Sequence, residues 1–377
     1  AAPGLLSAQE AIRLGALVPL TGAGGTYGTS MAAAMKGVID GVNAAGGVLG
    51  RTIALTIEDD QSNPEAAVRA AHKLIGADRV SAIMGTWQSA VTTAIAPLCW
   101  ESRTFLGTVS AADSITALPH QGFIIRTQAT SGLYGRKFGE FAVELGCKNM
   151  MLMTPQTPFT EIISASVKKV LADAGGKADV VVYDEKKPTL RSELDVALRS
   201  DPDVLLLGGY APDTTVLVKD IFRSGYKGKV LAWFYAVDQK VIDSLPAEVV
   251  EGIYTISQSP VIGDSAYQRL SDLLGVPNPD SSTAQAFDIA NLVAIAIAAA
   301  GSDTGEAIKD NVRKISQGGG KVVDNAVDGI AAVAAGEKVD YNGASGPCEF
   351  DEKGDTVEAK FRYEQVLSGK KELIKIA

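Results

Sequence analysis

Histidine and cysteine, which most often carry catalysis or bind metals, are scarce in this sequence. Its 377 residues include two histidines and three cysteines. The cysteines form no CxxC spacing or other metal or redox motif. The patterns GxSxG, HExxH and GxxxxGKS/T are also absent. Without residues grouped to act as a general base, the sequence favours a protein that is not an enzyme and has neither a cofactor nor a metal site.

An excess of basic residues is lacking as well. Asp and Glu number 44 and Lys and Arg number 35, which gives a net charge of −9 and a pI near 5.0. This balance argues against binding to nucleic acid or to an anionic membrane surface. The longest apolar run, residues 289–300, is shorter than the roughly 20 residues of a membrane-spanning helix. We interpret it as a buried helix and expect no direct membrane insertion.

Aromatic residues make up only 6% of the chain, yet Trp233, Phe234 and Tyr235 are adjacent. They follow an apolar run and precede polar residues. Neighbours in a strand point to opposite faces, so three adjacent aromatic side chains cannot all enter one core. The pattern raises the question of what the remaining ring faces.

Short apolar runs alternate with longer amphipathic segments. In the first part, strands are predicted at 12–20, 53–59, 80–85 and 104–109, and helices at 28–45, 64–76 and 89–101. In the second part, strands are predicted at 123–127, 149–154, 178–184, 203–209 and 229–234, and helices at 131–145, 160–174, 190–199 and 213–224. The alternation predicts an α/β protein with two doubly wound parallel sheets. Residues 265–335 read as almost wholly helical, and 348–376 as an antiparallel hairpin with its turn at 352–355.

Ligands of parallel sheets bind beyond the carboxyl ends of the strands, which makes the loops there candidate site positions. In the loop TGAGGTYG, Tyr27 takes the third glycine position of a dinucleotide fingerprint. A plain turn, or a loop that presents Tyr27 to a different ligand, therefore fits better than a nucleotide site. In GTWQS, Ser89 either caps the following helix or, together with exposed amides, holds a carboxylate. We expect Trp87 to line a pocket.

Several of these segments together resemble one known family. The glycine loop, the segment NAAGGVLGR and the strand end DDQSNP occur in one stretch, and IMGTWQSAVTTAIAP, LLLGGYAPD and FDEKGD follow. From residue 12 to about 365, the chain resembles the periplasmic solute-binding proteins of ABC transporters, in the leucine/isoleucine/valine-binding family.

The resemblance implies a type I periplasmic-binding-protein fold, in which two lobes joined by three hinge crossings close on a ligand. It places lobe one at 1–127 and 257–338, and lobe two at 128–256 and 339–377. It also implies a monomer that captures a small carboxylate in the periplasm and delivers it to an inner-membrane permease. The first fifteen residues lack the basic and apolar segments of a signal peptide. We presume that such a peptide has been removed.

The resemblance also assigns roles to single residues. Ser89 and nearby amides would grip the ligand carboxylate, and Thr108 and Ser110 would add contacts. The residues expected to line the site are Tyr27, Trp87 and Phe287 from lobe one, and Phe159, Tyr210 and Tyr235 from lobe two.

Tyr235 stands where amino-acid-binding members carry an acid that pairs with the ligand's ammonium group. Losing that partner costs on the order of 2–5 kcal/mol. This favours an aromatic or phenylpropanoid acid that lacks an α-amine. The rival ligand is a branched-chain or other hydrophobic amino acid, with Asp238 reaching into the site. Two other functions stay open, a ligand sensor for a regulatory partner and, less favoured, a nucleotide-dependent enzyme.

Overall fold

The computed structural model describes residues 10–158 and 160–377, which form two compact units. Unit 1 takes the described residues up to Ser110, then Ile115–Gln128 and Pro260–Glu358. Unit 2 takes Ala111–Ser114, Ala129–Ser259 and Ala359–Ala377. Apart from the short segment Ala111–Ser114, the chain passes from one unit to the other at 128–129, 259–260 and 358–359.

Unit 1 is built on a parallel sheet of five strands in the order β2-β1-β3-β4-β5. The strands are β1 (Ile12–Val18), β2 (Ile53–Asp59), β3 (Ala82–Gly85), β4 (Phe105–Thr108) and β5 (Ile124–Arg126). β1 is the switch point, because it pairs with β2 on one side and with β3 on the other. In such sheets the loops at the switch point are where ligands bind.

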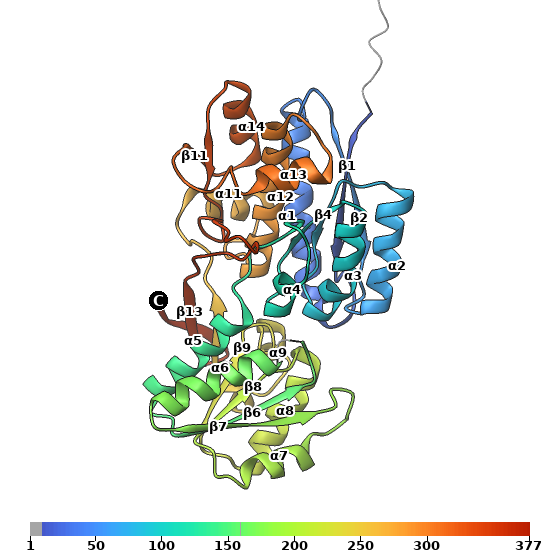
Figure 1. The fold of residues 1–377 in the computed structure, drawn as a ribbon. Coiled ribbons are helices and arrows are strands. Elements are labelled where there is room, and N and C mark those ends of the chain that lie inside the picture. The colour runs from blue at the N-terminus through green and yellow to red at the C-terminus, as the bar shows by residue number, and fades with distance from the viewer. Residues whose placement is uncertain (1–9, 159) are drawn as a thin grey trace, which may run out of the picture. The chain divides into compact units, whose positions relative to one another are not determined.

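Helices cover both faces of this sheet (Figure 1). Unit 1 contains α1 (Gly25–Ala44), α2 (Pro64–His72), α3 (Ser89–Glu101), α11 (Ser265–Leu274), α12 (Ser281–Ala300), α13 (Gly305–Val312) and α14 (Ala326–Ala334), and the short α4 (Asp113–Ala117) begins in unit 2 and ends in unit 1. α1 packs on α12, and α2 packs on α3. α12 is long and apolar enough to span a membrane, but 83% of its apolar window is buried inside the protein. It is the core helix of unit 1, as the sequence predicted.

Unit 2 contains a seven-stranded sheet in the order β14-β13-β10-β9-β8-β6-β7. Its strands are β6 (Asn149–Pro155), β7 (Lys177–Tyr183), β8 (Val204–Leu207), β9 (Lys229–Trp233), β10 (Tyr254–Gln258), β13 (Phe361–Leu367) and β14 (Lys370–Ile376). The first five run parallel, and β13 and β14 pair antiparallel at one edge.

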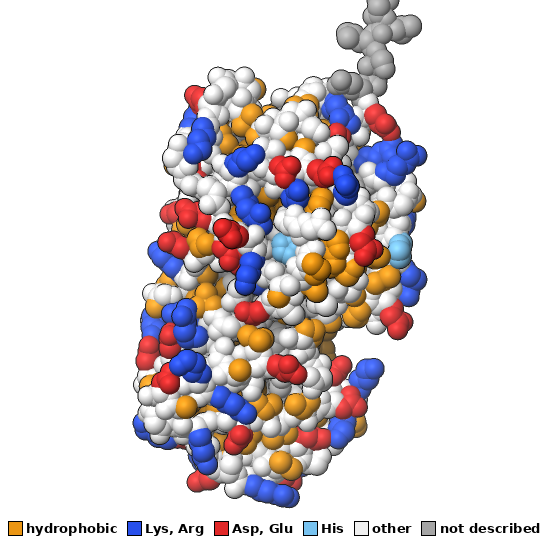
Figure 2. All heavy atoms as spheres, viewed as in Figure 1, with side chains coloured by type: hydrophobic (Ala, Val, Ile, Leu, Met, Phe, Trp, Pro, Cys, Tyr) orange, Lys and Arg blue, Asp and Glu red, His pale blue; other side chains and the backbone are white. Residues whose placement is uncertain are grey.

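The helices of unit 2 again lie on both sides of its sheet (Figure 1). They are α5 (Ser131–Glu144), α6 (Thr160–Asp173), α7 (Arg191–Leu198), α8 (Ala211–Ser224), α9 (Gln239–Asp243) and α10 (Ala247–Val250). One core cluster joins the apolar sides of α7, α8, α9 and α10 to the sheet. On the face drawn in Figure 2, acidic and basic side chains are interspersed over each unit rather than gathered by sign.

Three features differ from the sequence-based prediction. The hairpin of β13 and β14 turns at Ser368 and Gly369, not at 352–355. Both turn residues have positive φ, 51° and 78°, as a two-residue type I′ turn requires. The segment 265–335 also contains a short strand, β11 (Lys321–Val323), which pairs with β12 (Val339–Tyr341).

The third difference concerns residues 339–358, which were assigned to lobe two but pack in unit 1. The buried carboxylate of Asp288 on α12 holds them there. It accepts hydrogen bonds from the Tyr341 hydroxyl at 2.8 Å and from the amides of Ala344 and Ser345 at 2.8 and 2.7 Å. The other two long connections lie within about three residues of the expected positions 127–128 and 256–257.

Candidate functional site

Tyr27 and Trp87 lie together at the carboxyl end of the unit 1 sheet. Their rings stack with centroids 5.2 Å apart and planes 13° apart. Tyr27 belongs to the first turn of α1 and is buried, whereas the sequence placed it in a loop. The Trp87 indole donates from Nε1 to Ser282 Oγ on α12 at 3.0 Å. Gly24 makes room for this arrangement, since a Cβ there would lie 2.8 Å from the Trp87 ring.

Thr108 and Ser110 shape the turn that carries Trp87. Thr86, just before Trp87, has a φ of 55°, which is unfavourable for a β-branched residue. Thr108 Oγ1 donates to the Thr86 carbonyl at 2.8 Å and accepts from the Thr86 hydroxyl at 2.8 Å. Ser110 Oγ lies 2.9 Å from the Thr86 carbonyl oxygen and 3.0 Å from that of Trp87. Both hydroxyls therefore stabilise a strained turn, a role that the sequence did not predict.

Ser89 is the first residue of α3, and Gln88 is its N-cap, with no side-chain cap hydrogen bond. The sequence prediction that Ser89 is the N-cap is therefore off by one position. Ser89 is buried, and its carbonyl accepts from the Thr93 hydroxyl at 2.8 Å. The first amides of a helix have no partner within the helix and attract negative charge.

The N-terminus of α3 differs in its charged residues from the N-termini of three other helices, α8, α9 and α12. Its first turn contains no acidic residue. Asp213 lies in the first turn of α8, and Asp238 and Asp280 are the N-caps of α9 and α12. These carboxylates offset the positive ends of their helices, whereas the first turn of α3 contains no such carboxylate.

The remaining predicted residue of unit 1 that the structure describes is Phe287. It lies on α12 five residues after Ser282 and is 4% exposed. The same helix thus carries both Phe287 and the hydroxyl that holds Trp87. Phe159 lies outside the described residues.

In unit 2, Tyr210 and Tyr235 come together after β8 and β9. Their rings stack with centroids 5.6 Å and planes 27° apart. Tyr235 also stacks on Trp233, at 5.6 Å and 16°. Trp233 and Phe234 are buried, and Trp233 packs on Tyr134 and Phe138. Of the three adjacent aromatic residues, only Tyr235 is partly exposed.

Two carboxylates near these rings serve as helix caps. Asp213 accepts from the Tyr210 amide at 2.9 Å and from the Tyr183 hydroxyl at 2.6 Å. Burial raises the pKa of Asp213. A Cβ on Gly209 would lie 1.9 Å from its carboxylate, so glycine is required there. Asp238 accepts from the Val241 amide at 2.8 Å. The acidic residue three positions after Tyr210 is a capping signal that the sequence analysis missed.

The cysteines and other possible ligands form no metal site in the part of the chain that the structure describes. All three cysteines are buried and free. No three His, Cys, Asp or Glu side chains among residues 10–158 and 160–377 are grouped to hold an ion.

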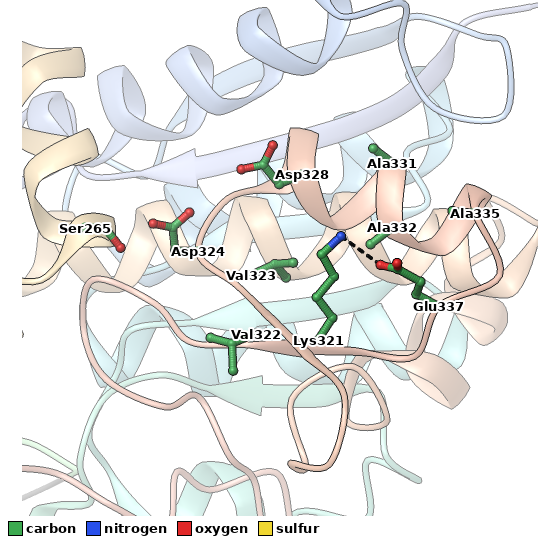
Figure 3. A pocket seen from close by; sticks show the side chains of 10 residues that line it. All are labelled: Ser265, Lys321, Val322, Val323, Asp324, Asp328, Ala331, Ala332, Ala335 and Glu337. Carbon is green, nitrogen blue, oxygen red and sulfur yellow. Dashed lines mark ion pairs between the residues drawn. The ribbon is translucent and has the colours of Figure 1, made fainter.

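Two cavities lie away from the predicted site residues. One, of about 430 Å³, lies against β11, α11 and α14 in unit 1, where Lys321 and Glu337 pair at 2.8 Å (Figure 3). The other, of about 650 Å³, lies against α5 and α6 in unit 2. None of the predicted ligand residues lines either cavity, so neither is the candidate site.

Known proteins with similar sequences bind small ligands. The chain is 25% identical over 315 residues to a leucine-, isoleucine-, valine-, threonine- and alanine-binding protein of Pseudomonas aeruginosa, covering 81% of this chain and 83% of that protein. It is 24% identical over 358 residues to a chemotactic signal transduction system substrate-binding protein of Halobacterium salinarum, covering 90% and 83%.

Solved structures show the same fold. A leucine-binding protein of Thermotoga maritima superposes with a TM-score of 0.83 at 22% identity, covering 97% of this chain and 98% of that one. A solute-binding protein of an ABC transporter from R. palustris, in complex with benzoate, superposes with a TM-score of 0.78 at 17% identity, covering 97% and 96%. The family model for periplasmic binding proteins matches residues 11–371. The chain therefore belongs to the periplasmic binding protein family, with the two-sheet α/β fold of its type I members.

Proposed function

We propose that the protein is the periplasmic receptor of an ABC importer and captures a small carboxylate, most specifically an aromatic or phenylpropanoid acid without an α-amine. A permease in the inner membrane would receive the ligand. The family match supports the receptor role, and the similar proteins include a leucine-binding protein and a solute-binding protein of an ABC transporter in complex with benzoate. We expect no enzymatic activity, a monomer in solution and a signal peptide on the precursor.

The N-terminus of α3 supports the carboxylate as the recognised group. It follows the Thr86–Trp87 turn, contains buried Ser89, and has no acidic residue in its first turn. A carboxylate placed there meets helix amides and the positive end of the helix dipole. Tyr27, Trp87 and Phe287 supply apolar surface in the same unit. That Ser89, Thr108 and Ser110 contact the ligand directly stays a prediction.

The observation that carries the proposed ligand class is the position of Tyr235. A neutral phenol stands where amino-acid-binding relatives are expected to have an acid, and its ring stacks with Tyr210 and Trp233. Asp238, the acid that the rival hypothesis requires, is the N-cap of α9. A buried ammonium without a partner is costly, whereas an aromatic ring gains from stacking. We predict that Tyr210, Tyr235 and Phe159 contact the ligand together with the unit 1 residues.

The test is a thermal-shift screen followed by calorimetry, with pairs of acids that differ only in the α-amine. The pairs are 3-phenylpropanoate and phenylalanine, phenylacetate and phenylglycine, and 4-methylpentanoate and leucine; benzoate and cinnamate complete the panel. A millimolar ligand and a micromolar site give about 4 kcal/mol of stabilisation. We expect stabilisation by amine-free aromatic acids. The primary amide 3-phenylpropanamide, which keeps the ring and lacks the charge, should bind weakly or not at all.

Preferential binding of phenylalanine or leucine would contradict this ligand class and favour the amino acid alternative. A variant Asp238→Asn would then show whether Asp238 supplies the ammonium partner. Stabilisation by a nucleotide instead would point to the enzyme alternative.

The second candidate function is a ligand sensor for a regulatory partner. It is favoured by one observation, the similarity to a chemotactic substrate-binding protein over 358 residues. Co-purification from native membranes, with ligand present, distinguishes the two roles. A permease as the captured membrane protein supports uptake, and a transducer supports sensing.

A further inference from the structure

Lys371 on β14 is bound to the turn that presents Tyr235. Its Nζ donates to the carbonyl oxygen of Phe234 at 2.7 Å. Phe234 directly precedes Tyr235, and Asp238 closes the same turn as the N-cap of α9. The two residues that fix this turn thus carry opposite charges. Lys371 binds the turn at the Phe234 carbonyl, and Asp238 joins the turn to α9 through the Val241 amide.

The charges around Lys371 leave Asp238 as its balancing partner. The charged groups that act on Lys371 are, strongest first, Glu364 on β13, Asp238, and Arg362 on β13. Arg362 and Glu364 form their own ion pair at 2.7 Å. Of these four groups, Asp238 and Lys371 are then the remaining pair of opposite charges, and α9, which packs on β14, adds one basic and one acidic residue, Lys240 and Asp243.

We propose that Lys371 determines specificity in the proposed ligand site, by compensating the charge of Asp238 so that the turn at Tyr235 offers no net negative charge to a ligand's ammonium group. The inference rests on the proposed function. Lys371 is a positioning residue, since it bonds to Phe234 and acts on the ligand through the turn. Unit charges interact over several ångströms in a partly dry environment. Removing the charge of Lys371 would therefore change ligand preference although no contact between protein and ligand is lost.

The loss of hydration around Lys371 agrees with this role. Burial of the ammonium lowers its pKa to about 8, against the stabilising effect of Glu364 and Asp238. The lysine is therefore charged at neutral pH and loses its charge in mildly alkaline solution. Asp238 then remains uncompensated.

The experiment measures, by calorimetry at pH 7, the ratio of Kd for phenylalanine to Kd for 3-phenylpropanoate. The other two pairs of the panel replace this one if neither of its members binds. In Lys371→Met the ratio should fall about tenfold, because Asp238 now attracts the ammonium group of phenylalanine, which 3-phenylpropanoate lacks. Lys371→Arg keeps the cation and should keep the wild-type ratio. Lys371→Met combined with Asp238→Asn should return the ratio close to the wild-type value.

A ratio is used because a partly unfolded preparation changes the number of sites but not the preference between two ligands. A pH series is the readout that a merely structural lysine would not affect. The affinity of wild type for 3-phenylpropanoate should fall between pH 7 and pH 9, and that of Asp238→Asn should not.

The outcomes separate the two proposals. If wild type binds an amine-free acid and Lys371→Met leaves the ratio unchanged, the role of Lys371 is overturned and the proposed function stands. If no acid of any pair binds wild type, both fail. Equal ratios in Lys371→Met with and without Asp238→Asn would also overturn the role of Lys371, because its effect would not pass through Asp238.

Discussion

Arg126 donates from Nε to Asp355 Oδ1 at 2.6 Å, and no part of the Arg126 side chain is exposed. A second donor, Nη2, binds the Thr116 hydroxyl at 2.7 Å, and the Arg126 amide binds the Gly354 carbonyl at 2.8 Å. Arg126 ends β5 just before the connection at 128–129, and Asp355 lies three residues before the connection at 358–359. The ion pair therefore ties together two of the chain segments that leave unit 1.

Asp355→Asn should destabilise the protein by about 3–5 kcal/mol, because it leaves a fully buried guanidinium without its counter-charge. The measurement is urea unfolding followed by circular dichroism. Glu306→Gln is the matched control, since it removes the partner of Arg103 in an exposed pair, with 69% and 47% of the side chains accessible. Its effect should be less than about 1 kcal/mol. Equal losses in the two variants would show that burial of Arg126 does not matter.

Tyr235→Glu should convert the ligand preference. The new carboxylate would stand where an ammonium group needs a partner, so the affinity for phenylalanine should rise at least about tenfold and that for 3-phenylpropanoate should fall. Tyr235→Gln controls for loss of the ring and should not improve phenylalanine binding. If both variants lose both ligands equally, stacking rather than charge governs position 235.

Thr108→Val should cost about 1–3 kcal/mol of folding free energy, because the Thr86 carbonyl and hydroxyl and the Ser110 amide lose a buried partner. The strained turn before Trp87 should relax, so all carboxylate ligands should bind more weakly by a similar factor. Thr29→Val, which removes an exposed hydroxyl bonded within α1, should leave both stability and binding nearly unchanged. Unaltered ligand binding in Thr108→Val would show that the turn at Thr86 does not contribute to the ligand site.

Asp60 should make the protein less stable as the pH rises. It is fully buried, one carboxylate oxygen accepts from the Ser62 amide at 2.7 Å, and the other has no hydrogen-bond partner. Burial raises its pKa from 3.8 to about 7. The folded protein thus holds a proton that the unfolded chain releases, and the benefit, about 1.4 kcal/mol per pKa unit, is present below pH 4 and lost as the pH rises through 7.

Urea unfolding of Asp60→Asn at several pH values from 4 to 8 checks this. The free energy of unfolding of the variant should not decline with pH in this way, so the variant should become more stable relative to wild type as the pH increases. A wild type that instead gains stability relative to Asp60→Asn over this range would show that Asp60 is ionised in the folded state.

Local patterns predicted the alternating strands and helices of both units, and α3 has the predicted bounds. Local patterns failed where contacts with residues distant in the sequence determine the structure. The hairpin turn was placed at 352–355 because glycine and charged residues favour a turn there, and residues 351–355 do turn back on themselves. The position of 339–358 depends on Asp288, more than 50 residues earlier in the chain.

The same limit applies to the site. Trp87 and Tyr235 stand out because aromatic residues are unusual in loops after strands, and Ser89 stands out because it lies at the start of a helix there. Lys371 does not, because its bond to the Phe234 carbonyl joins residues 137 positions apart. The roles of Thr108 and Ser110 likewise depend on the backbone angle of Thr86, which no local sequence pattern indicated.

The division of unit 1 along the chain has a consequence for how the protein is made. α1, at residues 25–44, packs on α12, at residues 281–300, and α12 contacts β3 and β4, so part of one face of the five-stranded sheet stays uncovered until most of the chain has been synthesised. β6 to β10 of unit 2 lie in one continuous stretch and can pair earlier. Closing so long a loop is entropically costly and slow. During that interval the apolar surfaces of the nascent sheet and of α1 are open to aggregation, and a chaperone that shields them would increase the yield of folded protein.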